Sequence, residues 1–173
     1  MSVIVNWELL LAILGVIGSL SAFGWQFHKD RKAANMEYIW RFTDAFTAAR
    51  MLKCRRAAVT SMAQGGGGRE VDEVLDFFEG LSLFYRKGIL DADTINSFFG
   101  YWIKRYWLLA EPYVQETRRR LKYPTLWDGM ETMAGQLYVR EHKISKIDRE
   151  ALVEKTRSTL AAFLAEEASL LSE

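Results

Sequence analysis

Cysteine, histidine and proline are scarce in this sequence of 173 residues. Cys54 is the only cysteine, so the chain cannot close a disulfide within itself, and a lone cysteine on a predicted helix is typically a small buried side chain. The two histidines, His28 and His142, are far apart, which leaves no spacing typical of a zinc site and no cofactor signal. With only two prolines, helix breakers are rare, and the sequence favours helices.

An excess of charge of one sign is also missing. The 23 basic and 22 acidic side chains give a formal net charge of +1, which does not indicate a polyanionic partner. Half of the residues are hydrophobic and 13% are aromatic, which excludes a disordered chain. The aromatic-rich segments are typical of a core rather than of base-stacking platforms, which argues against a nucleic-acid partner. No small-molecule substrate is evident from the residues.

One segment near the N-terminus lacks charge altogether. Leu9 to Phe27 contains no charged residue, and its length is close to the roughly 20 residues that cross a bilayer as a helix. It lacks the basic leader and the cleavage pattern of a signal peptide. We therefore predict a transmembrane helix within residues 1–32, with indoles near both ends. The expected anchor residues are Trp7, Leu10, Leu14, Ile17, Phe23 and Trp25.

Basic side chains follow this segment directly. Lys29, Arg31 and Lys32 predict that the C-terminal side faces the cytoplasm and the N-terminus lies outside, and they are candidates for contact with anionic lipid headgroups. Gly15 with Ser19, and Gly18 with Ala22, are small residues four apart, a spacing that lets membrane helices pair closely. These four residues are the candidates for pairing in a homo-oligomer.

Residues 33–173 read as a helical domain. Apolar residues recur at steps of three and four, which predicts about five amphipathic helices in a bundle and no sheet. The first helix is expected over residues 33–64 and is ended by the glycine run 65–68. We interpret this run as a flexible connector, because the Arg69 and Glu70 that follow it do not match the Lys and Ser or Thr of a phosphate-binding loop. The others are expected over 70–87, over 91–120 with a kink or end at Pro112, after Thr125 and after Ser145.

Several helix ends carry local signals. Gly88 is a suitable residue just past a helix C-terminus, and Asp91 or Asp93 a suitable N-cap. Two capping patterns, Thr125 to Asp128 and Ser145 to Asp148, predict the starts of the last two helices.

The stretch VLDFFEGLSLFYRKGILDADTINSFFGYWIKRYW, from Val74 to Trp107, lies ahead of a Tyr-x-x-Leu-Trp segment. It resembles a bacterial family called domain of unknown function 4760, through its phenylalanine pair with Glu79, the run from Arg86 to Asp91 and the aromatic helix that follows. The resemblance covers the chain to about Val139 and implies a small membrane-associated helical protein with no assigned activity. The glycine run and the acidic C-terminal segment have no counterpart in it.

Three carboxylates, Asp72, Asp76 and Glu79, are spaced along one side of a predicted helix. A solvated face is favoured over a cation site, because histidines or carboxylates from other helices are not identifiable. Glu79 borders the apolar stripe, so we expect a structural ion pair with Arg86 or Arg118. No nucleophile motif such as G-x-S-x-G is present, and no catalytic residues are predicted.

Two basic clusters remain. One is formed by Arg50, Lys53, Arg55 and Arg56, and the other by Arg118, Arg119, Arg120 and Lys122. Either cluster on a tethered domain would attract anionic headgroups, but the favoured reading of the second is the usual preference of basic residues for helix C-termini.

The working hypothesis is a non-enzymatic interaction module, anchored in a bacterial inner membrane by a single pass, with its C-terminal domain in the cytoplasm. It acts through self-association or as an accessory subunit of a membrane complex. The alternatives are an oligomeric membrane effector or pore subunit in stress or phage defence, and an enzyme whose active site is scattered along the sequence.

Overall fold

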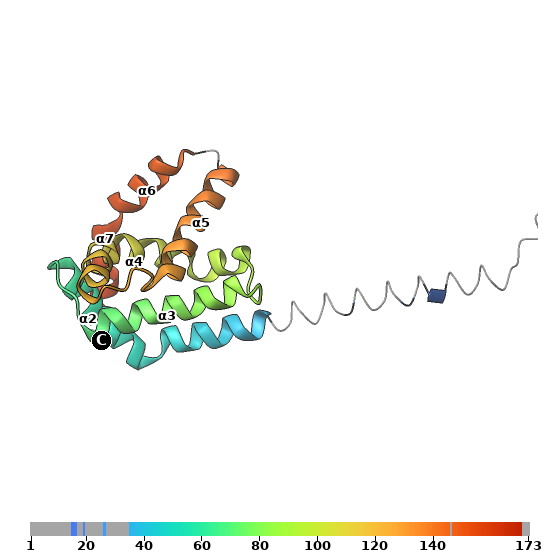
Figure 1. The fold of residues 1–173 in the computed structure, drawn as a ribbon, viewed down its shortest axis with the longest axis horizontal. Coiled ribbons are helices and arrows are strands. Elements are labelled where there is room, and N and C mark those ends of the chain that lie inside the picture. Colours follow the sequence, from blue (N-terminus) through green and yellow to red (C-terminus); the bar gives the residue numbers. More distant parts are fainter. Residues whose placement is uncertain (1–14, 17–18, 20–25, 27–34, 146, 171–173) are drawn as a thin grey trace, which may run out of the picture. The chain divides into compact units, whose positions relative to one another are not determined.

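The computed structural model describes residues 15, 16, 19, 26, 35–145 and 147–170 (Figure 1). Every regular element in these residues is a helix, which confirms the all-α prediction for this part of the chain. The chain divides into two compact units, Met1–Tyr38 and Ile39–Glu173. The second unit contains helical residues 39–47 and the helices α2 to α7.

The predicted fold class is corrected at the N-terminus. Within the described residues no helix is both long and apolar enough to cross a bilayer, so the transmembrane helix expected in residues 1–32 is not supported. The long helices that are described, α3 (Arg69–Arg86), α4 (Ala92–Leu121) and α5 (Asp128–Ser145), carry charged side chains that a span disfavours. Of the segment 9–27 itself, only Gly15, Val16, Ser19 and Gln26 are among the described residues.

The helix predicted over residues 33–64 is interrupted. Ala48 leaves the helical conformation, with φ −59° and ψ 140°, and α2 (Ala49–Ala63) starts after it. In the turns before the break, the hydroxyls of Thr43 and Thr47 donate to the carbonyls of Ile39 (2.8 Å) and Thr43 (2.9 Å). Threonines that bond back to the preceding turn compete with the helix and bend it. No sequence signal as strong as proline or glycine marks this break.

The glycine run that ends α2 is also a close-packing site. Gly65 and Gly68 have positive φ values of 72° and 143°, which other residues rarely adopt. Gly67 lies against the ring of Tyr113, and a β-carbon at Gly67 would be 1.8 Å from Tyr113 Cε2. The Ser61 hydroxyl donates to the Gly67 carbonyl at 3.0 Å. The loop therefore needs glycine for contact with α4 as well as for its turn.

The ends of α3 and α4 follow the sequence signals. Gly88 has φ 65°, and its N–H donates to the Tyr85 carbonyl while that of Ile89 donates to Phe84, the hydrogen bonds of a Schellman motif. Asp91 caps α4, because its Oδ1 accepts from the Thr94 N–H at 2.8 Å.

Of the two outcomes expected at Pro112, the helix end is wrong, since α4 continues through this residue to Leu121. Buried side chains lie on both sides of the proline, including Tyr106 and Ala110 before it and Val114 after it. Burial of both halves of α4 against the same core offsets the roughly 3 kcal/mol that an internal proline costs.

The C-terminal segment differs from its predicted form. Ser145 is the last residue of α5 rather than a cap, and Asp148 caps α6 (Arg149–Ser158) by accepting from the Glu150 N–H at 2.9 Å. The helix then breaks at Thr159, and a separate α7 (Leu160–Ala168) follows. The packing partners of α7 are mainly α2 and also α4 (Figure 1).

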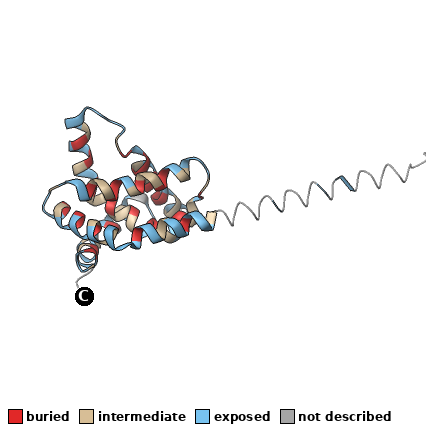
Figure 2. Ribbon diagram, turned by 90° about the horizontal axis from the view of Figure 1, so that it is seen from below, coloured by how far each residue is buried: buried red, intermediate tan, exposed pale blue. Residues whose placement is uncertain are grey.

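An aromatic cluster forms the centre of the core. The centroid of the Phe46 ring lies 5.1 to 5.6 Å from the centroids of four neighbouring rings, which come from α3 and α4. These rings belong to Phe77, Phe78, Phe99 and Trp102. Buried residues form stripes on the inward sides of the helices, and exposed residues cover the outer sides (Figure 2). Aromatic rings in edge-to-face pairs supply large buried area with defined geometry.

The contact between Gly67 and Tyr113 yields a stability prediction. We expect Gly67→Ala to lower the free energy of unfolding by about 1–3 kcal/mol, because the added methyl group overlaps the ring. The matched control is Gly80→Ala in α3, where a β-carbon meets nothing within 4 Å. Alanine there should raise stability by up to about 1 kcal/mol. Urea unfolding of both variants measures the difference, and equal effects would contradict the proposed overlap.

Candidate functional site

The row of carboxylates on α3 accepts hydrogen bonds from other parts of the fold. Asp72 Oδ1 accepts from the Tyr113 hydroxyl at 2.7 Å, and Asp76 Oδ1 accepts from the Trp127 indole N–H at 2.7 Å. In the described part of the chain no group of three or more His, Cys, Asp or Glu side chains is arranged to hold a metal. The row is thus not a simple solvated face, because its members hold α4 and the α4–α5 turn against α3.

Glu79, the third member of the row, caps a different helix. Its Oε2 accepts from the Met130 N–H at 2.8 Å, and its Oε1 from the Gly129 N–H at 3.2 Å, at the start of α5. A carboxylate at this position satisfies free N–H groups and opposes the positive helix end. Gly129 permits the approach, since a β-carbon there would lie 2.6 Å from Glu79 Oε1. The capping pattern had placed this acceptor on Thr125, within the local sequence.

The predicted ion-pair residues separate into two contacts. Arg86 Nη2 lies 3.3 Å from Glu79 Oε1, so the structure brings these two side chains together. Arg118 instead pairs with Glu131 of α5 at 2.8 Å, and its Nε donates to the Leu126 carbonyl at 2.8 Å. Both arginines therefore help to fix the α4–α5 turn and the first turns of α5.

A second carboxylate network lies in the core, and sequence reasoning missed it. Glu167 of α7 is fully buried and forms an ion pair with Arg55 of α2, whose Nε donates to Glu167 Oε2 at 2.9 Å and whose Nη2 donates to Oε1. Two side chains of α4 donate to the same carboxylate: the Tyr106 hydroxyl to Oε2 and the Trp102 indole N–H to Oε1 at 3.2 Å. Four donor groups thus surround one glutamate.

Arg55 is held in place by contacts besides Glu167. Its Nη1 donates to the Phe46 carbonyl at 3.2 Å, and its guanidinium lies 3.9 Å from the centre of the Phe46 ring, a cation–π contact. Burial alone lowers the pKa of Arg55, but hydrogen bonding and the charge of Glu167 outweigh it, so this pKa is raised. Burial and the Glu167 charge raise the pKa of Tyr106 well above its usual value, which keeps the phenol protonated as a donor.

A signal for this network is present in the sequence. Arg55 occupies a position of the apolar stripe of α2 that continues with Ala58, Val59 and Met62, all buried. Glu167 follows the buried Phe163 by four residues, so it lies on the same face of α7. Opposite charges at stripe positions of two helices indicate a buried ion pair. A search of each stripe for apolar residues alone does not find such a pair.

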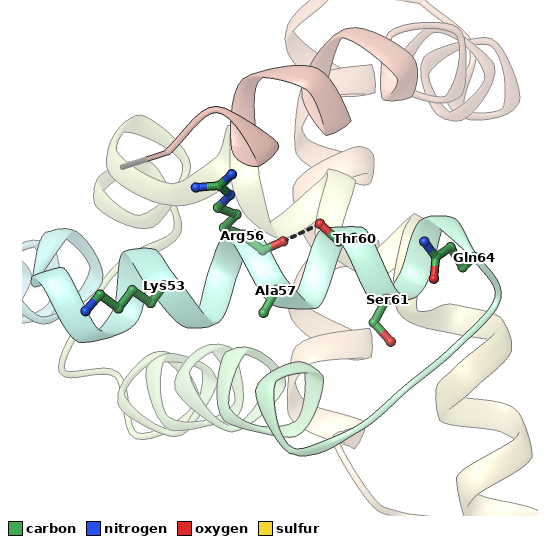
Figure 3. Close-up of a pocket in the computed structure, with 6 residues that line it drawn as sticks. All are labelled: Lys53, Arg56, Ala57, Thr60, Ser61 and Gln64. Carbon is green, nitrogen blue, oxygen red and sulfur yellow. Dashed lines mark hydrogen bonds between the residues drawn. The ribbon is translucent and has the colours of Figure 1, made fainter. Parts of the chain in front are cut away.

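The first basic cluster is divided by the fold. Arg55 is buried, whereas Lys53 and Arg56 are exposed and line a shallow hollow on α2 together with Ala57, Thr60, Ser61 and Gln64. In Figure 3 the side chains of Arg56 and Ser61 point to opposite sides of the helix. The polar groups of this hollow therefore do not point toward a common position. The donors around Glu167, in contrast, all point toward one carboxylate.

The second basic cluster lies at the C-terminal end of α4, where positive charge suits the helix dipole. Arg119 pairs with Glu116 of the preceding turn, and Arg120 is exposed. Lys122 ends the helix with φ 53°. Together with the inward contacts of Arg118, this arrangement fits the helix-end interpretation.

Residues 9–137 match a family model described as Domain of unknown function (DUF4760). This chain belongs to the DUF4760 family. The match confirms the resemblance seen in the sequence. No curated protein and no solved structure matches the chain. The matched residues include Arg55, Trp102 and Tyr106 of the buried network, whereas Glu167 and all of α6 and α7 follow the matched segment.

Most of the predicted membrane residues fall outside the described part of the chain. This applies to the anchor residues Trp7, Leu10, Leu14, Ile17, Phe23 and Trp25, to Gly18 and Ala22, and to Lys29, Arg31 and Lys32. Of the four pairing candidates, Gly15 and Ser19 are described, and both are exposed. The Ser19 hydroxyl donates to the Gly15 carbonyl, four residues earlier, at 2.8 Å.

Cys54 is half-buried on α2, and its thiol donates to Glu73 Oε2 at 3.2 Å. Burial, followed by the hydrogen bond and the charge of Glu73, raises the pKa of this thiol above its usual value. Only the thiolate is nucleophilic, so this environment suppresses reactivity. Cys54 is thus only half-buried, and it has a polar contact that the sequence did not predict.

The Glu79 cap yields a second stability prediction. We expect Glu79→Ala to lower the free energy of unfolding by about 1–2 kcal/mol, because the first N–H groups of α5 lose their acceptor. Glu154→Ala, which removes an exposed carboxylate paired with the exposed Arg157 three residues away, is the control and should change stability by less than about 0.5 kcal/mol. Urea unfolding compares the two, and similar small losses would show that the cap contributes nothing.

The Cys54 environment gives a pH-dependent prediction. Because the pKa is raised, alkylation by iodoacetamide at pH 8 should be slower than that of a free cysteine, and the rate should rise only at higher pH. Glu73→Gln removes the negative charge that raises the pKa, while Arg50, which lowers it, is retained, so this variant should react faster. An unchanged pH profile in Glu73→Gln would refute the role of this carboxylate.

Proposed function

We propose that this DUF4760 protein is a non-enzymatic interaction module that binds a second copy of itself. The carboxylate row of α3 and the single cysteine are engaged in contacts between helices or with the turn after α4. Asp72, Asp76 and Glu79 accept hydrogen bonds from the neighbouring helix and turn, and the Cys54 thiol is held by Glu73. The function is therefore assigned to the outer surface of the fold.

The observation that carries the proposal is the exposure of Trp40. This indole is 55% exposed, although the residues Ile39 and Phe46 of the same helical segment are buried. Its ring makes an edge contact with the half-buried Phe98 of α4, with 5.9 Å between centroids. Exposed tryptophans that rest on a second aromatic ring are typical anchors of protein interfaces.

The charge of the chain favours a second copy as the partner. With a formal net charge of +1, two copies have little mutual repulsion, and proteins near zero net charge associate readily. A larger complex in which this chain is an accessory subunit is the competing outcome of the experiment below.

Sedimentation of the purified full-length protein tests the proposal. We expect a dimer or higher oligomer for the natural sequence, and Trp40→Ser should raise the dissociation constant by about thirtyfold or more, as for an interface anchor. The matched control is Leu121→Ser, which removes a side chain that is 57% exposed at the far end of α4 and should leave the mass unchanged.

Circular dichroism verifies that both variants are folded. A natural sequence that sediments as a monomer at all concentrations would contradict self-association. A stoichiometric second protein that co-purifies with the natural sequence and is lost in Trp40→Ser would replace it with the accessory-subunit role.

A further inference from the structure

The donors around Glu167 have the arrangement of a carboxylate-binding site. Arg55 presents two N–H groups in the fork geometry that suits a carboxylate, and Tyr106 and Trp102 add one donor each. All of these donors come from α2 and α4, and the carboxylate comes from α7, more than 60 residues further along the chain than Tyr106. The donors and the carboxylate thus come from segments that are far apart in the sequence.

The site is organised by the core as well as by its occupant. Arg55 is fixed through its contacts with the carbonyl and the ring of Phe46. Tyr106 is fully buried, and the centroid of its ring lies 5.6 Å from that of Phe78. A pocket whose donors are already oriented binds its ligand at a lower entropic cost. The donors also lie within the residues that match the family, whereas the occupant follows them.

The occupant is a short helix with little stability of its own. α7 has nine residues and no side-chain hydrogen bond at its N-cap, and isolated helices of this length are not stable in water. Its most deeply buried contacts are Phe163, whose ring centroid lies 5.2 Å from that of Tyr106, and Glu167 one turn later, while Leu160 and Leu164 pack against the core beside them. Glu166 adds an exposed hydrogen bond from the Tyr101 hydroxyl at 2.6 Å.

We propose that Arg55, Tyr106 and Trp102 form a receptor for a carboxylate carried on a helix, and that α7 occupies it as a displaceable latch. The external ligand is an acidic helix of a protein partner with an aromatic residue four positions before a glutamate, the pattern of Phe163 and Glu167. Such a helix competes with α7 for the same donors. The proposal does not depend on Trp40 or on self-association.

The test supplies α7 as a separate peptide. The full-length chain carrying Glu167→Ala lacks the internal carboxylate, so its α7 is held mainly by apolar contacts. The probe is a fluorescent peptide of residues 158–173 measured by anisotropy. We expect this variant to bind the peptide, and the natural chain to bind it at least about thirtyfold more weakly because its own α7 competes. Circular dichroism and a thermal unfolding transition confirm that the variant is folded.

Two controls separate carboxylate recognition from apolar docking. The same peptide with Gln at position 167 should bind about thirtyfold more weakly, and the chain with Arg55→Met and Glu167→Ala together should lose binding to a similar extent. Equal affinity of the Glu and Gln peptides, or unchanged binding without Arg55, overturns the proposal. Absence of peptide binding to the folded Glu167→Ala chain overturns it as well.

A second variant covers the case in which Glu167→Ala does not fold. Glu167→Gln keeps the shape of the side chain and a hydrogen-bond acceptor while removing its charge, so it weakens the latch without emptying the core. Peptide binding to this variant above that of the natural chain supports the receptor, and binding no stronger than that of the natural chain overturns it.

Discussion

The buried ion pair between Arg55 and Glu167 is the constraint on which the arrangement of the C-terminal helices depends. Both side chains are almost completely removed from water, which is costly for charged groups unless every polar atom finds a partner. Here the carboxylate receives the guanidinium, a phenol and an indole, and the guanidinium also contacts the carbonyl and ring of Phe46. A buried ion pair of this kind adds little to stability over an apolar core. Removal of one of its two side chains, however, leaves an unpaired buried charge, which costs about 3–5 kcal/mol. It therefore specifies where α7 docks.

The same principle organises the other side of the fold. Glu79 supplies the cap of α5 from α3, and Asp72 and Asp76 hold the side chains of Tyr113 and Trp127. Carboxylates of one helix thus position the neighbouring helix and the turn after it. In both sets of contacts, carboxylates connect helices or turns that are distant in the sequence. The surface, with the exposed indole of Trp40, is where an interaction function is assigned.

The sequence was sufficient for the elements whose signals are local. The Schellman turn at Gly88, the cap at Asp91 and the apolar stripes of α3 and α4 follow directly from residue types and spacing. The errors arise where contacts between distant residues decide the outcome. Pro112 stays within a helix because both halves are buried, and the cap of α5 comes from Glu79 rather than from Thr125. The transmembrane prediction was made on residues 9–27, and no described helix supports it.

The candidate site was predicted only in part, for the same reason. Glu79 and Arg86 lie seven residues apart on one helix, so their contact was accessible to sequence reasoning. The pairing of Arg55 with Glu167 joins residues 112 apart, and no local pattern specifies which arginine meets which glutamate. Likewise, the contact of Gly67 with Tyr113 depends on the path of a loop. Long-range partners of charged residues require the fold, even where the stripe position of each residue already indicates burial.

The most direct test of this account is a double-mutant cycle on the buried pair. The unfolding free energies of the natural chain, Arg55→Met, Glu167→Leu and the double variant give the coupling between the two residues. The account predicts a coupling of about 1–3 kcal/mol, with the double variant more stable than the sum of the single losses implies, because no unpaired charge is left in the core. Additive losses, with a coupling near zero, would contradict the claim that Arg55 and Glu167 hold α7 in place.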